Sequence, residues 1–257
     1  MGAEDNTETE CKSRLIRRAI KIIMLAAFGV LAVAVLASCS SNNGSQPAMS
    51  DTQPYEDGSS EHYSSPLPLL KTDWTRVKIP DVGTIDIPPS MEAQGVENRG
   101  QADDSGVNSD SFIIQQKGMN NILTNKEIGS NASIIVNETT GAAGDYDSLD
   151  FDISEWTQSD ISDLNDKFKE QVQSQFEGTS VQLQEWYPLQ LEIDNGMSDI
   201  HVQYARTFED NPSVLVNQYI FQNSDKMYTL TFSYEIDEAK TWAADLDYSF
   251  STFRVAI

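Results

Sequence analysis

The sequence predicts an α+β domain, an antiparallel sheet of about six strands flanked by helices, behind an N-terminal targeting segment and a flexible tether. Apolar and polar residues alternate in consecutive stretches between residues 181 and 234, and residues 156–178 and 237–253 repeat apolar residues at helical spacing. Ahead of them, an apolar run and a cysteine precede a long stretch rich in Ser, Asn, Gly and Pro, which is typical of a tether.

The N-terminal segment has the parts of a secretory signal. Basic residues between Lys12 and Lys21 precede an uncharged apolar run over residues 22–36. As a helix, this run would be about 22 Å long, against about 30 Å of hydrocarbon in a bilayer. We therefore expect residues 1–38 to be a cleaved signal peptide. Its end resembles the lipobox of bacterial lipoproteins, which implies acylation of the cysteine: Leu36, Ala37, Ser38 and Cys39.

Such a protein lies in the bacterial cell envelope, faces away from the cytoplasm and contacts the membrane through the lipid on Cys39. In the alternative reading, the segment stays uncleaved as a single N-terminal transmembrane helix, whose basic flank remains inside the cell. Both anchors leave the domain on the same side of the membrane. Residues 39–69 are expected to form the tether, and residues 70–257 a single domain.

Composition excludes several classes of function. The two cysteines are Cys11 and Cys39, so a processed chain has no disulfide and no thiolate site. The net charge of −23 disfavours binding to nucleic acid. No nucleophile elbow, phosphate-binding loop or dinucleotide fingerprint is present, and the residues imply no cofactor.

The first half of the domain is predicted to hold short strands. Residues 74–79 and 84–87 alternate around a turn at 80–83, and the double proline at 88–89 ends the second strand. Residues 92–111 are polar and predict a long mobile loop. Further strands are expected at 112–116 and 133–136.

A helix is predicted next, over residues 156–178, with Thr157 and Asp160 as a capping pair and Gly178 at its end. The alternating residues 181–191 then predict a strand, and Asn195-Gly196 a tight hairpin. Residues 214–221 are apolar on both faces, which indicates a central strand. Residues 228–234 alternate again, and Asp237 is expected to cap the last helix.

This order of elements resembles the PsbP-like superfamily. The strand end Ile85-Asp86-Ile87-Pro88-Pro89-Ser90-Met91, the amphipathic helix, the four-strand meander and a closing helix with Trp242 and Phe253 support the resemblance. It covers about residues 70–257 and implies an α/β/α sandwich. The family includes small bacterial lipoproteins of the DcrB type. Its members are binding, assembly or chaperone-like accessories, and they offer no shared catalytic set.

Closely spaced aspartates form the first candidate site, because hard cations bind several oxygen ligands. They do not match the glycine and distal glutamate of an EF-hand loop, and the alternative is an acidic loop before a helix N-terminus. The possible cation ligands are Asp145, Asp147, Asp150 and Asp152.

His201 and Trp186 are two further candidate residues. His201 lies on a predicted strand without an assignable nucleophile, so we expect a partly exposed strand residue and no metal site. Trp186 precedes a proline and could face outward to stack on a ligand, although packing in the core is the favoured reading.

We expect a membrane-anchored envelope lipoprotein that is not an enzyme and that binds an envelope protein partner or supports assembly. The alternative is a module that binds a small ligand or a cation. A hydrolase with a carboxylate pair has less support, because so acidic a chain always holds some suitable pair.

Overall fold

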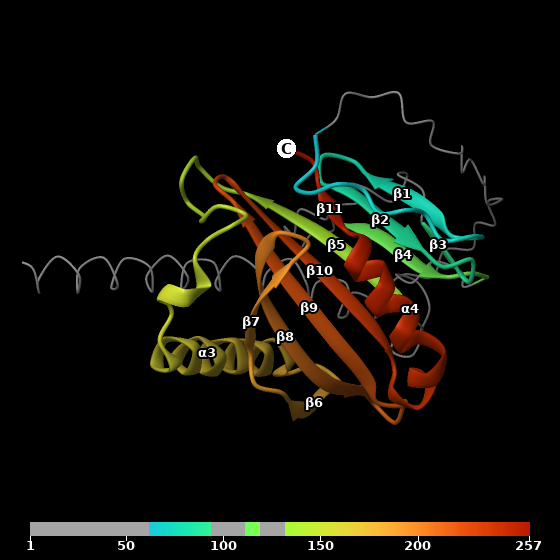
Figure 1. Ribbon diagram of the computed structural model, residues 1–257. Helices are drawn as coiled ribbons and strands as arrows, with labels where there is room; N and C mark the ends of the chain where they lie inside the picture. The colour runs from blue at the N-terminus through green and yellow to red at the C-terminus, as the bar shows by residue number, and fades with distance from the viewer. Residues whose placement is uncertain (1–61, 94–110, 119–131) are drawn as a thin grey trace, which may run out of the picture.

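The computed structural model describes residues 62–93, 111–118 and 132–257 (Figure 1). The predicted signal peptide, Cys39 and most of the predicted loop at 92–111 lie outside these residues. Among the helices that are described, none is long and apolar enough to cross a membrane.

The predicted fold class is confirmed, but the described sheet is larger than about six strands. Eight strands form an antiparallel sheet in the order β3-β4-β5-β10-β9-β8-β6, and β7 also pairs with β8. Their bounds are β3 Met91–Ala93, β4 Phe112–Gln116, β5 Ser133–Thr140, β6 Val181–Trp186, β7 Gln190–Asp194, β8 Met197–Phe208, β9 Val214–Asn223 and β10 Lys226–Glu235.

A second, three-stranded sheet has the order β1-β2-β11, and its last strand comes from the C-terminus. Strands β7 to β10 form a meander, as predicted, whereas β6 pairs with β8 and not with β7. Local alternation also does not show that the chain end returns to β2. The bounds of these strands are β1 Thr75–Ile79, β2 Gly83–Ile87 and β11 Arg254–Val255.

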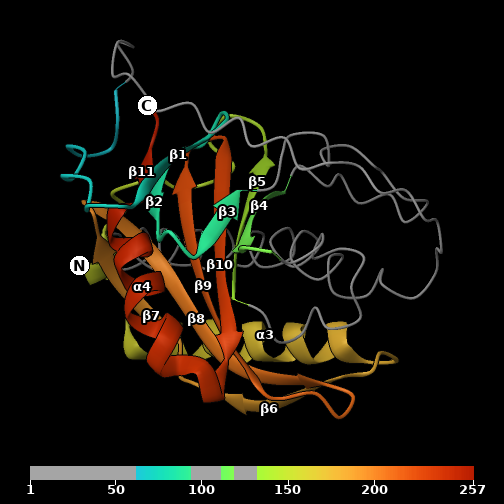
Figure 2. The same ribbon diagram turned by 90° about the vertical axis from the view of Figure 1, so that its right-hand side faces the viewer.

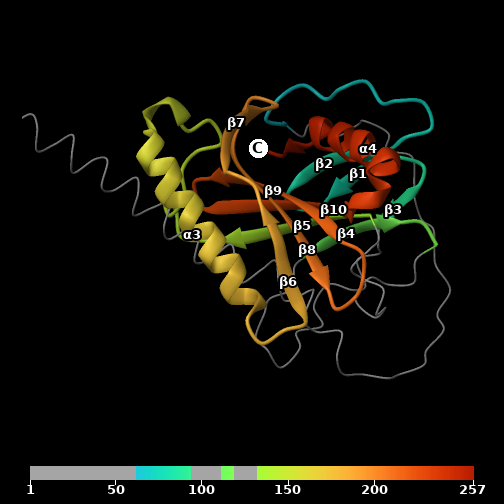
Figure 3. The same ribbon diagram turned by 90° about the horizontal axis from the view of Figure 1, so that it is seen from below.

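Two helices cover opposite faces of the large sheet. Figure 3 shows α3 (Gln158–Phe176) on one side, and α4 (Ala239–Thr252) with the small sheet on the other. Each side encloses its own apolar core. The four buried residues of α3 pack with β6, β8 and β9 in one core, while α4 packs with β1, β2 and β10 in the other. Figure 2 shows α4 beside β2, which it contacts.

Helix α3 begins as predicted. The Thr157 side chain accepts from the backbone N–H of Asp160, and the Asp160 carboxylate accepts from the backbone N–H of Thr157, which completes a capping box. Gly178 follows the helix at a φ of 76°, which favours glycine. The Asn195-Gly196 turn also forms, with φ angles of 55° and 78°.

Two local predictions are wrong. Residues 181–191 do not form one strand, because the chain breaks between β6 and β7 around Pro188, and each piece pairs with a different part of β8. Asp237 does not cap α4. It lies in a 3₁₀ turn, η4 (Ile236–Glu238), and the N-cap residue Glu238 makes no side-chain capping bond.

The described part of the chain begins at residue 62, inside the segment predicted as tether. Tyr63 forms an isolated bridge with Ala256, and the Ser64 backbone N–H donates to the carbonyl of Val255 at 2.8 Å. The chain around residue 63 therefore lies against the C-terminus, a contact that only the tertiary structure reveals.

Candidate functional site

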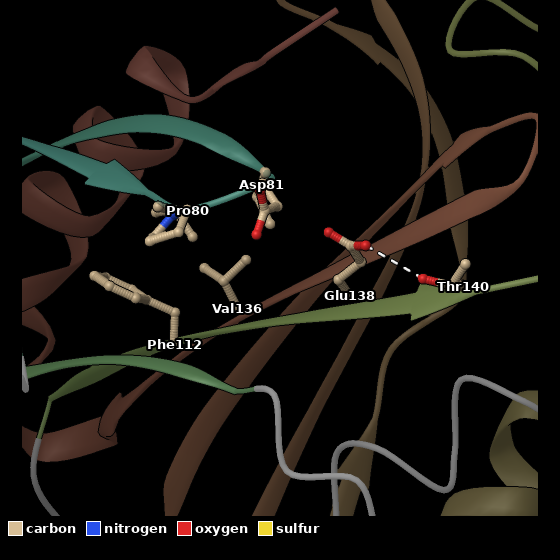
Figure 4. A pocket seen from close by; sticks show the side chains of 8 residues that line it. Pro80, Asp81, Phe112, Val136, Glu138 and Thr140 are labelled. Carbon is tan, nitrogen blue, oxygen red and sulfur yellow. Dashed lines mark hydrogen bonds between the residues drawn. The ribbon is translucent and has the colours of Figure 1, made fainter. Parts of the chain in front are cut away.

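A pocket of about 310 Å³ lies between the β1–β2 turn and strands β4 and β5 (Figure 4). Figure 4 shows Pro80 and Asp81 on the turn, facing Phe112 and Val136 on the strands. Apart from Asp81, the side chains here are apolar. The lining residues are Ile79, Pro80, Asp81, Val82, Phe112, Val136, Glu138 and Thr140.

Polar groups gather at one end of this pocket. Glu138 accepts a hydrogen bond from Thr140 at 3.3 Å and forms a 2.9 Å ion pair with Lys226. Burial lowers the pKa of Lys226, but the hydrogen bond and charge of Glu138 outweigh that effect, so the pKa lies above its ordinary value. Asp81 is exposed and lies close enough to Lys226 to raise its pKa further. Lys226 thus pairs with Glu138, and the exposed carboxylate of Asp81 interacts with the same ammonium group at longer range.

A second polar group lies on the β7–β8 hairpin, far from this pocket in sequence. The Asn195-Gly196 turn sets a register in which Glu192 is directly opposite Asp199. Asp194 is two residues from Glu192, so it lies on the same face of the sheet. One oxygen from each of the three carboxylates lies within 4.8 Å of the others, and this is the one group in the described chain with such spacing among His, Cys, Asp and Glu.

Asp199 is the buried member of this carboxylate group. Its exposed fraction is 0%, and neither carboxylate oxygen accepts a hydrogen bond from a donor group of the protein. Burial, followed by the charge of Asp194, a hydrogen bond from the protonated Asp199 to Asp194 and the charge of Glu192, raises the pKa of Asp199 to about 8. Glu192 and Asp194 are half-buried, so solvent reaches the group from their side.

Aromatic rings form a wall beside these carboxylates. His201 stacks on Tyr219 with ring centroids 4.4 Å apart, and Tyr219 stacks on Phe250 of α4. Burial raises the pKa of Tyr219, and Asp247 raises it further, so the phenol stays neutral. The Nε2 atom of His201 lies 3.2 Å from Oδ1 of Asn217. The half-buried position of His201 agrees with the expectation from sequence, and no nucleophile accompanies it in these contacts.

The aspartates predicted as cation ligands take part in local turns. Asp145 accepts from the backbone N–H of Ala142 at 2.8 Å, and Asp152 accepts from both the backbone and the hydroxyl of Ser154. The structure does not gather Asp145, Asp147, Asp150 and Asp152 into a group like that of the hairpin.

Trp186 packs inward, as the favoured reading expected, and does not face solvent as a ligand platform. Its ring stacks on Tyr204 with centroids 5.9 Å apart, and its indole N–H donates to Asn165 of α3 at 3.0 Å. Trp186 is half-buried, and helix α3 supplies the acceptor for its indole N–H.

Sequence reasoning missed the carboxylate group of the hairpin, although a signal for it was present. Once Asn195-Gly196 is accepted as a two-residue turn, residues 194 and 197 pair, and so do 192 and 199. The acids at 192, 194 and 199 then share one face. What the sequence does not show is that Phe250 of α4 packs on Tyr219 and accepts a hydrogen bond from Asn195, or that Asp199 is completely buried.

Comparison with known proteins gives fold likenesses only. No family model matches the chain, and no curated protein matches it significantly. The solution structure of PsbP from the cyanobacterium Synechocystis sp. PCC 6803 is similar at 17% identity, with 74% of this chain and 97% of that one covered and a TM-score of 0.43.

Two other solved structures are also similar. LpqN of Mycobacterium tuberculosis, described as involved in cell envelope biogenesis, matches at 11% identity over 79% of this chain and 89% of its own, with a TM-score of 0.35. A Pseudomonas aeruginosa protein of unknown function matches at 9% identity over 70% and 95%, with a TM-score of 0.33. Likenesses of this size concern the course of the chain and do not extend to activity or partners.

Proposed function

We propose that this chain is an acylated envelope lipoprotein, anchored through Cys39, whose folded domain is a non-enzymatic module that binds a protein partner. The anchor is supported by the basic flank, the short apolar run and the Leu36–Cys39 motif. The binding role is supported by the pocket beside β5, in which an apolar lining adjoins carboxylates.

The chemistry of this pocket favours a basic partner. An apolar side chain of the partner would bury against Phe112 and Val136, and a neighbouring Lys or Arg would meet Asp81 and Glu138. The single ammonium group of Lys226 leaves one carboxylate charge for the partner. The net charge of −23 would attract a basic segment over a longer range.

Intact mass spectrometry of the membrane-extracted protein tests the anchor. We expect a mature chain that starts at Cys39 and carries added acyl mass, with both features lost in a Cys39→Ala variant. If the wild-type protein in the membrane is instead full-length and unmodified at Cys39, an uncleaved helix anchors it.

Photo-crosslinking in intact envelopes tests the partner. With a photoreactive residue at Thr140 on the pocket rim, we expect one discrete adduct whose cross-linked peptide contains Lys or Arg. Asp81→Asn should weaken it, because this change removes the charge and suits the positive φ of 63° at that position. The same label at exposed Ser162 on α3 is the control. Equal adducts at both positions, or an adduct unchanged by Asp81→Asn, would contradict the proposal.

A further inference from the structure

The carboxylate group of the β7–β8 hairpin combines close spacing with a buried, unpartnered member. Glu192, Asp194 and Asp199 place one oxygen each within 4.8 Å of one another. Asp199 is completely buried, contributes its oxygen to this group and accepts no hydrogen bond. It is therefore a buried carboxyl group that has no N–H donor or positive partner and lies beside two further acids.

The domain contains a second buried aspartate, Asp86, which has the positive partner that Asp199 lacks. Asp86 is equally buried, but Arg76 pairs with both of its carboxylate oxygens. No Lys or Arg of the described residues forms an ion pair with the three acids of the hairpin. The charges that act on Asp199 are those of Asp194 and Glu192, and all of them are negative. An uncompensated buried carboxylate is costly, so the folded state must neutralise Asp199 with a proton or with a cation.

We propose that Glu192, Asp194 and Asp199 bind a divalent cation, with calcium as the best fit. All three donors are carboxylate oxygens, which suit hard cations and do not select zinc or copper. Three oxygens that lie within 4.8 Å of one another can all contact one ion at calcium–oxygen distances of about 2.4 Å. Magnesium demands near-ideal octahedral geometry and loses its waters reluctantly, so the more flexible coordination of calcium suits this group better.

The hairpin provides one buried ligand for this cation and two ligands that solvent reaches. Asp199 on β8 is completely buried, while Glu192 and Asp194 on β7 are half-buried and leave room for water to complete the coordination. The site is distinct from the pocket beside β5 and does not depend on the lipid anchor. With three carboxylates and water as ligands, we expect a dissociation constant of roughly 10⁻⁴–10⁻³ M, in the range of extracellular calcium modules.

Calcium titration of the full chain, purified in detergent and freed of metal by a chelator, tests this site. At about 10 mM calcium and constant ionic strength, we expect the melting temperature to rise by about 3–10 °C, because an ion that binds the folded state alone stabilises it. Asp199→Asn keeps the shape of the side chain without its charge and should abolish the rise. Glu192→Gln should weaken calcium binding at least tenfold in isothermal titration calorimetry.

Matched variants separate this site from general attraction of cations to an acidic protein. Asp163→Asn removes an exposed acid on α3, and Asp150→Asn removes one in the loop first predicted to bind a cation. Both should keep the full response to calcium. If calcium, magnesium and manganese all leave the melting temperature of the wild-type chain unchanged, a proton alone neutralises Asp199 and the proposal is wrong. A calcium response that persists in Asp199→Asn also overturns it.

Discussion

Arg76 binds both carboxylate oxygens of Asp86, from Nε to Oδ1 at 2.7 Å and from Nη2 to Oδ2 at 2.9 Å. The same Nη2 donates to the carbonyl of Pro68, and the backbone N–H of Asp86 donates to Thr252 Oγ1 at 2.9 Å. This pair therefore joins β1, β2, the preceding segment and the end of α4. The hydrogen bond with Asp86 raises the pKa of Arg76, so the guanidinium stays charged.

Removal of this guanidinium should destabilise the domain strongly. In an Arg76→Ala variant, the carboxylate of Asp86 stays buried without a partner, and we expect a loss of about 3–5 kcal/mol in the free energy of unfolding. Urea unfolding followed by circular dichroism measures it. Lys240→Ala on the exposed side of α4 is the control and should change stability by less than about 0.5 kcal/mol. Similar values for the two variants would show that the pair contributes little.

Asn165 of α3 connects the helix to the edge of the sheet. Its Oδ1 accepts from the indole N–H of Trp186 and from the backbone N–H of Leu189, both at 3.0 Å. Asn165→Ala leaves both donors unsatisfied and should cost about 1–3 kcal/mol. Asn165→Asp retains an acceptor oxygen and should retain most of the stability. Thermal unfolding of the two variants separates loss of the acceptor from loss of the side chain, and equal losses would contradict this account.

The metal-free domain should lose stability as the pH rises. Burial and the neighbouring acids raise the pKa of Asp199 from 3.8 to about 8. Between these values the folded state holds a proton that the unfolded state has released, so the free energy of unfolding falls with pH by up to about 1.4 kcal/mol per unit. The loss is complete above about pH 8.

Urea unfolding in a chelating buffer at several pH values between 5 and 8.5 measures this dependence. Asp199→Asn has no proton to lose at this position, so its profile should be flatter than that of the wild-type chain. Parallel profiles would show that Asp199 does not titrate in this range.

Gly83 is required for the pairing of the C-terminal strand. A Cβ at this position would lie 1.9 Å from the carbonyl oxygen of Arg254. We expect Gly83→Ala to force β11 away from β2 and to cost about 2 kcal/mol or more. Hydrogen exchange of the Val255 amide, measured by mass spectrometry, should accelerate relative to the amides of β9. Protection that stays unchanged would show that the strands move apart without losing their pairing.

Features that depend on neighbours in sequence could be predicted well. The capping box of Thr157 and Asp160 needs only three residues of spacing, and the Asn195-Gly196 turn needs only residues that tolerate positive φ. The central position of β9 followed from its apolar residues on both faces, and eight of its ten residues are buried. The Asp237 cap failed, because the last strand runs into a 3₁₀ turn that places Glu238 at the helix start.

The two candidate sites were harder to predict from the sequence, because residues far apart in the chain form them. Asp81 lines the pocket from the β1–β2 turn of the small sheet, and Glu138 lines it from β5 of the large sheet. The four aspartates between 145 and 152 looked like ligands by spacing, yet the hydrogen bonds of Asp145 and Asp152 are made within their own turns.

The sequence alone determined the class of fold, the caps and turns, and the expectation of an anchor at Cys39, because each depends on local pattern or composition. Only the tertiary structure decided which acids are buried and which of them are paired. Asp86 and Asp199 are the same residue type on strands, but one lies against Arg76 and the other beside Asp194. Whether a buried charge is satisfied depends on the distant residues packed against it, and periodicity carries no information about them.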